Sequence, residues 1–187
     1  MANVPAIVAG IIIIIGFILA VSILWPDITG APWLPTRMKK VRKMLEIVNV
    51  QPDEVLYDLG CGDGRIIVMA ARKFGARAVG VEIDPLRYLW CQFLITILGL
   101  RKRVKVLYGD LFKKDLSDAD VVVCYLLQRT NDKLVDKLIM ELKPETRIVS
   151  NTFVFIELPL IDEDQESSVY VYKIGDKERY NVVKKST

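Results

Sequence analysis

The sequence predicts an α/β fold in which helices cover a mostly parallel sheet, and three observations lead to that prediction. From Val55 onwards, strand-like and helix-like segments alternate along the chain, as they do when helices connect parallel strands. A glycine-rich turn joins the first of these strands to the first helix that follows it. Acidic residues stand at the ends of three successive strands, and parallel α/β sheets bind their ligands at that edge.

Each element is predicted from its apolar pattern and its boundary residues. Thr36 is expected to cap an amphipathic helix that runs to about Asn49. Pro85 suits the start of a helix, and Gly75 and Gly99 suit the ends of two others. Two segments on either side of a Gly-Asp pair, 168–174 and 180–183, are rich in β-branched and aromatic residues and predict an antiparallel hairpin. The remaining elements are expected at 55–59 (strand), 64–74 (helix), 78–83 (strand), 85–99 (helix), 104–108 (strand), 121–126 (strand), 131–143 (helix) and 147–152 (strand).

Residues 1–25 are predicted to form an N-terminal transmembrane anchor. No residue from Val4 to Trp25 carries a charge, and a helix that rises about 1.5 Å per residue over such a length spans the roughly 30 Å hydrocarbon layer. A cleaved signal peptide is the alternative, but it requires a basic start, which Met1-Ala2-Asn3 does not provide. Residues 26–36, which contain prolines and a glycine, are predicted to be a linker, and 37–187 a single catalytic domain.

Basic residues beyond the anchor predict its orientation. Because positive charge stays on the cytoplasmic side of a membrane, we expect a single-pass protein with its catalytic domain on the cytosolic side, or on the matrix side if the chain is mitochondrial. A nucleic-acid patch is the alternative, but a net charge of +3 with 23 acidic residues does not favour a general polyanion binder. The basic residues are Arg37, Lys39, Lys40, Arg42 and Lys43.

The composition excludes two classes of site. The chain has no histidine, and its three cysteines, Cys61, Cys91 and Cys124, form no Cys-x-x-Cys pair. Zinc centres and Ser-His-Asp hydrolase chemistry are therefore not expected, and we predict no metal site. Isolated thiols in apolar surroundings are typical of a reducing compartment.

The turn from Asp58 to Arg65 predicts the cofactor. Its spacing is Gly-x-Gly-x-Gly rather than the Gly-x-Gly-x-x-Gly of dinucleotide sites. Asp58 would repel a pyrophosphate, but it suits S-adenosyl-L-methionine (SAM), which carries an ammonium and a sulfonium group. Glu82, at the end of the next strand, can accept hydrogen bonds from ribose hydroxyls, and Asp110 ends the third strand. The alternative is that the glycines only shape a turn and the acids only cap helices.

The predicted helix 85–99 is unusual because it is apolar nearly all round, with Arg87 as its only charge. A helix that faces water normally has a polar stripe. Its outer face is therefore expected to be covered, and burial within the monomer, contact with a membrane and contact with another subunit all remain open. Arg101, Lys102, Arg103 and Lys105 follow it, as expected on a surface that rests on a membrane.

Several of these motifs together resemble a known family. The stretches 57–65, 80–85, 109–112, 118–122 and 125–127 are similar to the archaeal broad-specificity protein lysine methyltransferases and the membrane-anchored mitochondrial ATP synthase c-subunit lysine methyltransferases. The likeness covers about residues 35–150. It implies a Rossmann-like seven-strand methyltransferase sheet with a C-terminal antiparallel hairpin, and SAM as cofactor. Cys61 is placed in the cofactor loop as a small space-filler rather than a nucleophile. The cofactor contacts implied are Asp58, Gly60, Gly62, Glu82, Asp110 and Leu111, with Thr36 at the methionine end.

The chemistry needs little beyond the alignment of a neutral amine with the methyl group in a site that excludes water. Tyr125 and Asn151, which end the fourth and fifth strands, are the candidate catalytic residues that line the substrate channel and orient the amine. The alternatives are an aromatic ring packed under the next helix and a turn cap. Relatives often place a histidine and a tryptophan after the fifth strand, where this chain has Asn151-Thr152-Phe153. The Asn/Asp-Pro-Pro-Tyr/Phe signature of enzymes that methylate base amines is absent at Cys124–Leu127.

Together these features predict a membrane-anchored, SAM-dependent methyltransferase that acts on lysine side chains of proteins near a membrane, with no nucleic acid partner. The alternatives are a small-molecule or lipid-associated methyltransferase and a non-catalytic SAM-binding adaptor. An acidic stretch beyond the fifth strand is either a solvated loop or a surface that steers basic substrates. It comprises Glu157, Asp162, Glu163, Asp164 and Glu166.

Overall fold

A computed structural model of the chain describes residues 5, 7–16 and 34–176. The chain divides into two compact units, Met1–Trp33 and Leu34–Thr187. In the first unit, residues 7–16 are helical, and their isoleucines are exposed. Within the described ranges, no helix is both long enough and apolar enough to cross a membrane. Residues 17–25 of the predicted anchor lie outside those ranges, so the anchor stays a prediction.

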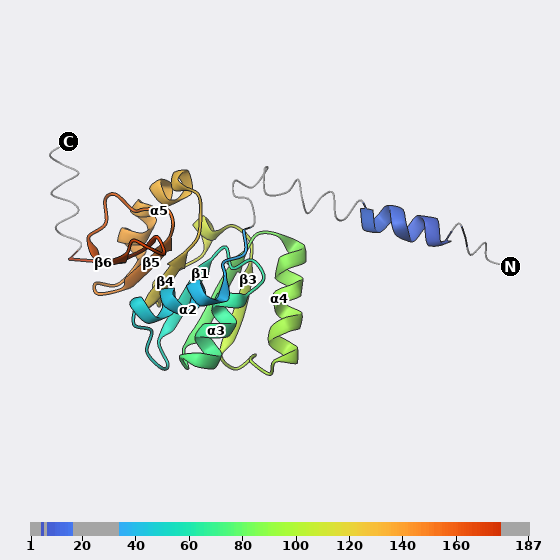
Figure 1. Ribbon diagram of the computed structural model, residues 1–187, viewed down its shortest axis with the longest axis horizontal. Helices are drawn as coiled ribbons and strands as arrows, with labels where there is room; N and C mark the ends of the chain where they lie inside the picture. The colour runs from blue at the N-terminus through green and yellow to red at the C-terminus, as the bar shows by residue number, and fades with distance from the viewer. Residues whose placement is uncertain (1–4, 6, 17–33, 177–187) are drawn as a thin grey trace. The chain divides into compact units, whose positions relative to one another are not determined.

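The second unit is built on a seven-stranded sheet with the strand order β3-β2-β1-β4-β5-β7-β6 (Figure 1). The first five strands are parallel, and β7 runs antiparallel to both of its neighbours. The predicted mixed sheet with a C-terminal antiparallel hairpin is therefore confirmed. The strands are β1 (Val55–Leu59), β2 (Arg77–Glu82), β3 (Val104–Tyr108), β4 (Val121–Cys124), β5 (Arg147–Asn151), β6 (Leu160–Asp164) and β7 (Val169–Lys173).

Helices cover both faces of this sheet. α2 (Met38–Ile47), α3 (Arg65–Lys73) and α4 (Pro85–Ile97) contribute to one buried apolar cluster. α5 (Gln128–Glu141) contributes to a second cluster on the opposite face, and the 3-10 helix η1 (Leu111–Lys113) follows β3. Every residue of β1 and β4 is buried, because central parallel strands are enclosed on both faces.

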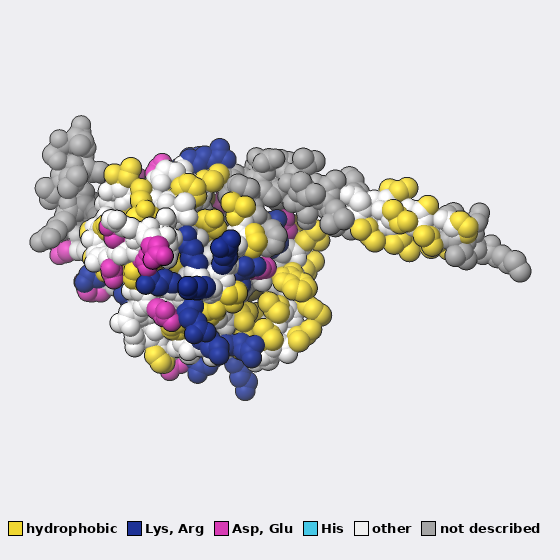
Figure 2. All heavy atoms as spheres, in the orientation of Figure 1, with side chains coloured by type: hydrophobic (Ala, Val, Ile, Leu, Met, Phe, Trp, Pro, Cys, Tyr) yellow, Lys and Arg dark blue, Asp and Glu magenta, His cyan; other side chains and the backbone are white. Residues whose placement is uncertain are grey.

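The described part of the second unit does not bury α4, so it does not supply the burial within the monomer that was one of the alternatives open from the sequence. Only Cys91 and Ile95 of this helix are buried. Its outer side leaves a patch of apolar side chains at the surface (Figure 2).

The C-terminal hairpin lies earlier in the chain than the sequence predicted. The strand expected at 168–174 is β7, but its hairpin partner is β6, whereas residues 180–183 lie outside the described ranges. β6 was missed because it occupies the edge of the sheet and four of its five residues are exposed. An edge strand tolerates charge and shows no alternation of apolar and polar residues. Residues 160–164 of the acidic stretch are therefore strand rather than a solvated loop.

The remaining boundaries differ by a few residues. α2 begins after Arg37, which makes no side-chain capping bond, so the prediction that Thr36 caps this helix was wrong. β4 ends at Cys124, before the predicted 126, and α5 begins at Gln128, three residues before the predicted start.

Candidate active site

The turn between β1 and α3 adopts a backbone that favours glycine. Gly60, Gly62 and Gly64 have φ angles of 82°, 57° and 82°, in the left-handed region that residues with a Cβ rarely adopt. The backbone N–H groups of Gly60 and Cys61 both donate to the Val81 carbonyl at 2.9 Å. The turn is thereby tied to the end of β2, and its backbone lies at the edge where β1, β2 and β4 end.

Cys61 fills the space beneath this turn. A Cβ on Gly80 would stand 2.6 Å from Cys61 Sγ, so the close approach of β2 requires a glycine at position 80. A hydrogen bond with Cys91 and burial both raise the pKa of the Cys61 thiol. Because the thiolate is the nucleophilic form, this cysteine stays an unreactive space-filler, as the sequence indicated.

Two carboxylates lie next to this turn. Asp58 on β1 is 2% exposed, and its Oδ2 has no hydrogen-bond donor in the described part of the chain. Burial, with a smaller contribution from the charges of Glu82 and Asp63, raises the pKa of Asp58 to about 8. Glu82 Oε2 accepts from Gly62 N and Oε1 from Asp84 N, both at 2.8 Å. Burial raises the pKa of Glu82 as well, and those two hydrogen bonds oppose the shift.

An orphaned, buried carboxyl is costly unless a donor or a cation satisfies it. Asp58 therefore fits a ligand that brings positive charge to the turn. The ammonium of SAM is such a group, so the residues present fit the predicted cofactor.

The third acidic residue has a structural role of its own. Asp110 follows β3, and its Oδ1 accepts from Phe112 N at 3.0 Å, which caps η1. The capping alternative therefore applies to this residue, and cofactor binding through Asp110 remains a prediction. Leu111 is partly buried against the second apolar cluster. Gly109 N donates to the Glu82 carbonyl at 2.8 Å, which brings this segment to the end of β2.

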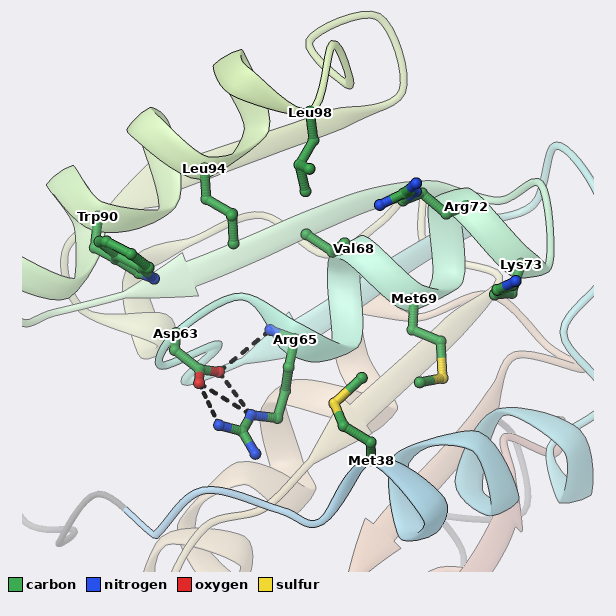
Figure 3. Close-up of a pocket in the computed structure, with 10 residues that line it drawn as sticks. All are labelled: Met38, Asp63, Arg65, Val68, Met69, Arg72, Lys73, Trp90, Leu94 and Leu98. Atoms are coloured by element: carbon green, nitrogen blue, oxygen red, sulfur yellow. Dashed lines mark hydrogen bonds and ion pairs between the residues drawn. The ribbon is translucent and has the colours of Figure 1, made fainter.

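Thr36 reaches the site although it is not a helix cap. The Thr36 side chain is buried, and the Thr36 backbone carbonyl accepts from Arg65 Nη1 at 2.5 Å. Arg65 Nε in turn donates to Asp63 Oδ1 at 2.8 Å (Figure 3). Thr36 Oγ1 also accepts from Asn151 Nδ2 at 3.5 Å. The segment before α2 is thus connected both to the glycine turn and to the end of β5.

Tyr125 and Asn151 lie at the same edge of the sheet as Asp58. Leu59 of β1 is in register with Cys124 of β4, and Cys124 with Ser150 of β5. Tyr125 follows Cys124 and Asn151 follows Ser150, so both lie at the end of the sheet where the glycine turn begins, and Asn151 still pairs with Val169 of β7. Tyr125 is half-buried and Asn151 is buried.

Asn131, on α5, is a site residue that the sequence reasoning missed. It is fully buried, and its Nδ2 donates to Ser150 Oγ and to the Phe153 carbonyl, both at 3.3 Å. It therefore supports the segment that carries Asn151. The available signal was a polar residue on the same helix face as Leu134 and Leu138, which are buried.

Comparisons with known proteins agree with this geometry. The model of the ANTKMT methyltransferase domain family matches residues 58–160, a stretch that contains the glycine turn, all three acids, Tyr125 and Asn151. The chain belongs to the ANTKMT methyltransferase domain family.

Two relatives and one solved structure extend this result. A protein-lysine N-methyltransferase of Saccharolobus islandicus is 42% identical over 152 residues, which cover 78% of this chain and 94% of the relative. The human ATP synthase c-subunit lysine N-methyltransferase is 29% identical over 66% of this chain and 52% of its own length. The structure of an RNA methyltransferase from Salinibacter ruber in complex with S-adenosyl-L-homocysteine is 40% identical, covers 76% of this chain and 95% of that one, and superposes with a TM-score of 0.72.

This member of the family is therefore a SAM-dependent methyltransferase, as the sequence predicted. The predicted resemblance to protein lysine methyltransferases is confirmed by the same comparisons. The chain spans about half the length of the human relative but nearly all of the archaeal one.

Proposed function

We propose that this chain transfers methyl groups from SAM to lysine side chains of proteins. The observation that carries the proposal is the 42% identity to an archaeal protein-lysine N-methyltransferase over 94% of that protein. The human relative, which is named for lysine methylation of the ATP synthase c-subunit, supports the same substrate class.

On the cofactor side, Asp58, Glu82 and the backbone of Gly60 and Gly62 would hold SAM, with Asp110 and Leu111 beyond the end of β3. When bound, SAM supplies a methyl carbon that its sulfonium has already activated. Asp58 would accept from the cofactor's ammonium, because its Oδ2 is buried with no other donor in the described residues. Cys61 fills the floor of the turn against Gly80.

On the substrate side, Tyr125 and Asn151 would orient the lysine amine. The amine must be neutral to attack, and removal from water lowers its pKa from about 10.4. Asn151 Oδ1 already accepts from Thr152 Oγ1 at 3.0 Å, and its second lone pair can accept from an amine. The Tyr125 hydroxyl offers a further acceptor at the same edge. Neither residue needs to act as a strong base, because the proton can leave to water after transfer.

A membrane location is part of the proposal. The charge-free stretch 4–25 would anchor the chain, and the basic residues on α2 and just before it would keep the domain on the cytosolic or matrix side. Lys39 and Arg42 on α2 are exposed, which supports an electrostatic contact with anionic headgroups. Lys43 instead pairs with Asp164 of β6 at 2.8 Å.

RNA methylation is the second candidate function, since the Salinibacter ruber protein at 40% identity is described as an RNA methyltransferase. The absence of an Asn/Asp-Pro-Pro-Tyr/Phe signature at 124–127 argues against methylation of base amines. Net charge favours RNA only weakly, since 26 basic residues face 23 acidic ones.

One assay separates these functions. The purified full chain is incubated with SAM that carries an isotopically labelled methyl group, in parallel with membrane proteins, total RNA and a lipid extract, and mass spectrometry locates the label. We expect label on lysine ε-nitrogens in the protein arm. Asp58→Ala should abolish transfer in every arm, which serves as the control for contaminating enzymes. Label found only in RNA or only in lipid would refute lysine methylation.

A further inference from the structure

α4 presents an apolar face that nothing in the described part of the second unit covers. Five of its large apolar side chains are between 41% and 65% exposed, whereas the outer face of a helix that faces water is normally polar. They are Leu86, Leu89, Trp90, Phe93 and Ile97. Figure 2 shows hydrophobic side chains gathered over α4.

A groove of about 520 Å³ extends this face towards α3 (Figure 3). Trp90 and Leu94 of α4 line it together with Leu98, the C-cap of that helix, and Val68 and Met69 of α3 lie opposite. The groove and the exposed residues of α4 form one continuous apolar surface, which we call the α4 surface. Met38 and the paired Asp63 and Arg65 also line the groove, whereas Asp58 and Glu82 do not.

Cations border the α4 surface at one end. Arg72 and Lys73 line the groove at the end of α3, and Arg101 and Lys102 lie in the turn between α4 and β3. All four are exposed. α3 and α4 each follow a parallel strand, so both helices run the same way and end away from the cofactor edge. Three acids of this region, Asp63, Asp84 and Asp53, already form ion pairs with arginines of the same unit.

We propose that the α4 surface docks on a lipid bilayer that contains anionic lipids. The apolar side chains would enter the boundary between headgroups and acyl chains, and the four cations would contact lipid phosphates, as in other interfacial helices. An aromatic residue such as Trp90 suits this boundary because its ring is amphipathic. The inference does not rest on methyl transfer, and the contact is separate from the N-terminal anchor.

Two other occupants fit the surface less well. A second copy of the chain would offer the same apolar face and the same cations, with no matching acids, because a two-fold contact pairs a patch with itself. The chain's own N-terminal stretch is apolar and could cover the α4 face. It has no acidic residue before Asp27, so it would leave the four cations unpaired. A bilayer with anionic lipids satisfies both parts of the surface.

Trp90 reports on this contact directly. The other two tryptophans are replaced in the full chain (Trp25→Phe, Trp33→Phe), and the protein is added to vesicles of phosphatidylcholine with or without phosphatidylglycerol, whose acyl chains carry bromine as a quencher. With the anionic vesicles, we expect Trp90 emission to shift to shorter wavelength and to be quenched. Added salt should weaken both effects, because it screens the cations.

Variants in the same background test the two parts of the surface. Leu89→Glu with Phe93→Glu should lose the shift and the quenching. Met140→Glu is the matched control, because Met140 is 74% exposed on α5, across the sheet. Replacement of the four cations by glutamine should remove the preference for phosphatidylglycerol. Circular dichroism checks that each variant is folded. If the double glutamate variant does not fold, the proposal is tested by the emission shift in the parent and by the loss of the phosphatidylglycerol preference in the cation variant.

Vesicle sedimentation of the same samples measures attachment of the whole chain, which the N-terminal anchor can provide, whereas Trp90 emission measures the α4 contact. The two hypotheses are therefore tested separately. Trp90 emission that stays unshifted and unquenched in sedimented chain would overturn the proposal. The proposal would also be overturned if a soluble quencher failed to quench Trp90 emission before vesicles are added, because the α4 surface would then already be covered. In that case, sedimentation velocity identifies the occupant, since a dimer indicates a second copy and a monomer indicates the N-terminal stretch.

Discussion

SAM affinity should depend on pH through a single buried carboxyl. Asp58 has a pKa of about 8 in the unliganded protein, because burial disfavours its charged form and Glu82 and Asp63 add negative charge nearby. SAM brings a cation, which interacts with the ionised carboxylate and not with the neutral acid. Binding therefore requires Asp58 to lose its proton, and the affinity should rise with pH up to about 8.

The magnitude follows from that pKa. A carboxyl with a pKa of about 8 is about half ionised at pH 8 and about one hundredth ionised at pH 6. The dissociation constant of SAM should therefore be up to about 50-fold weaker at pH 6 than at pH 8, or about 2.3 kcal/mol. The contribution of Asp58 to the stability of the unliganded protein should instead fall as pH rises. Because the folded-state pKa is raised, the contribution of Asp58 is fully present below about pH 4 and is lost as pH rises towards 8.

Isothermal titration calorimetry in buffers with different ionisation enthalpies measures both the affinity and the protons released. Wild type should release nearly one proton per SAM at pH 7. Asp58→Asn keeps the shape but cannot ionise, so it should bind weakly and lose most of the pH dependence. Glu82, whose pKa burial also raises, accounts for the remainder. Asp136→Asn, on the exposed side of α5, is the control. A flat pH profile in wild type, or an unchanged slope in Asp58→Asn, would refute the reasoning.

Three further predictions test the rest of the site. Glu82→Gln should weaken SAM binding at least about tenfold, because it disturbs the hydrogen bonds from Gly62 and Asp84 and removes a charge; unchanged affinity in calorimetry would contradict this. Tyr125→Phe should leave the SAM dissociation constant unchanged and lower kcat about fivefold, the value of one neutral hydrogen bond; equal kcat would make Tyr125 a packing residue. Gly80→Ala should cost about 1–3 kcal/mol in urea denaturation, since the new Cβ would lie 2.6 Å from Cys61 Sγ, and Cys61→Ala in the same chain should recover part of that loss.

The strands of the central sheet were predictable because their apolar composition indicates that they are buried. β4 is an apolar run, and β1 is apolar apart from Asp58, as expected of buried strands. Asp84-Pro85 marks the start of α4, because the Asp84 side chain accepts from two backbone N–H groups. β6 carried no such signal, because an exposed edge strand places few constraints on its residues. Its pairing with β7 depends on the neighbour that the fold provides.

The sequence by itself determined the cofactor turn, the acids at the strand ends and the alternation that builds the sheet, because these depend on residues close together in the chain. Only the tertiary structure decided how those parts meet. It joined Thr36 to Asn151, placed Asn131 beneath the segment that carries Asn151, left Asp58 Oδ2 buried without a donor among the described residues, and exposed the outer face of α4. Burial, charge and contact at such positions depend on elements far apart in sequence, which a local pattern does not encode.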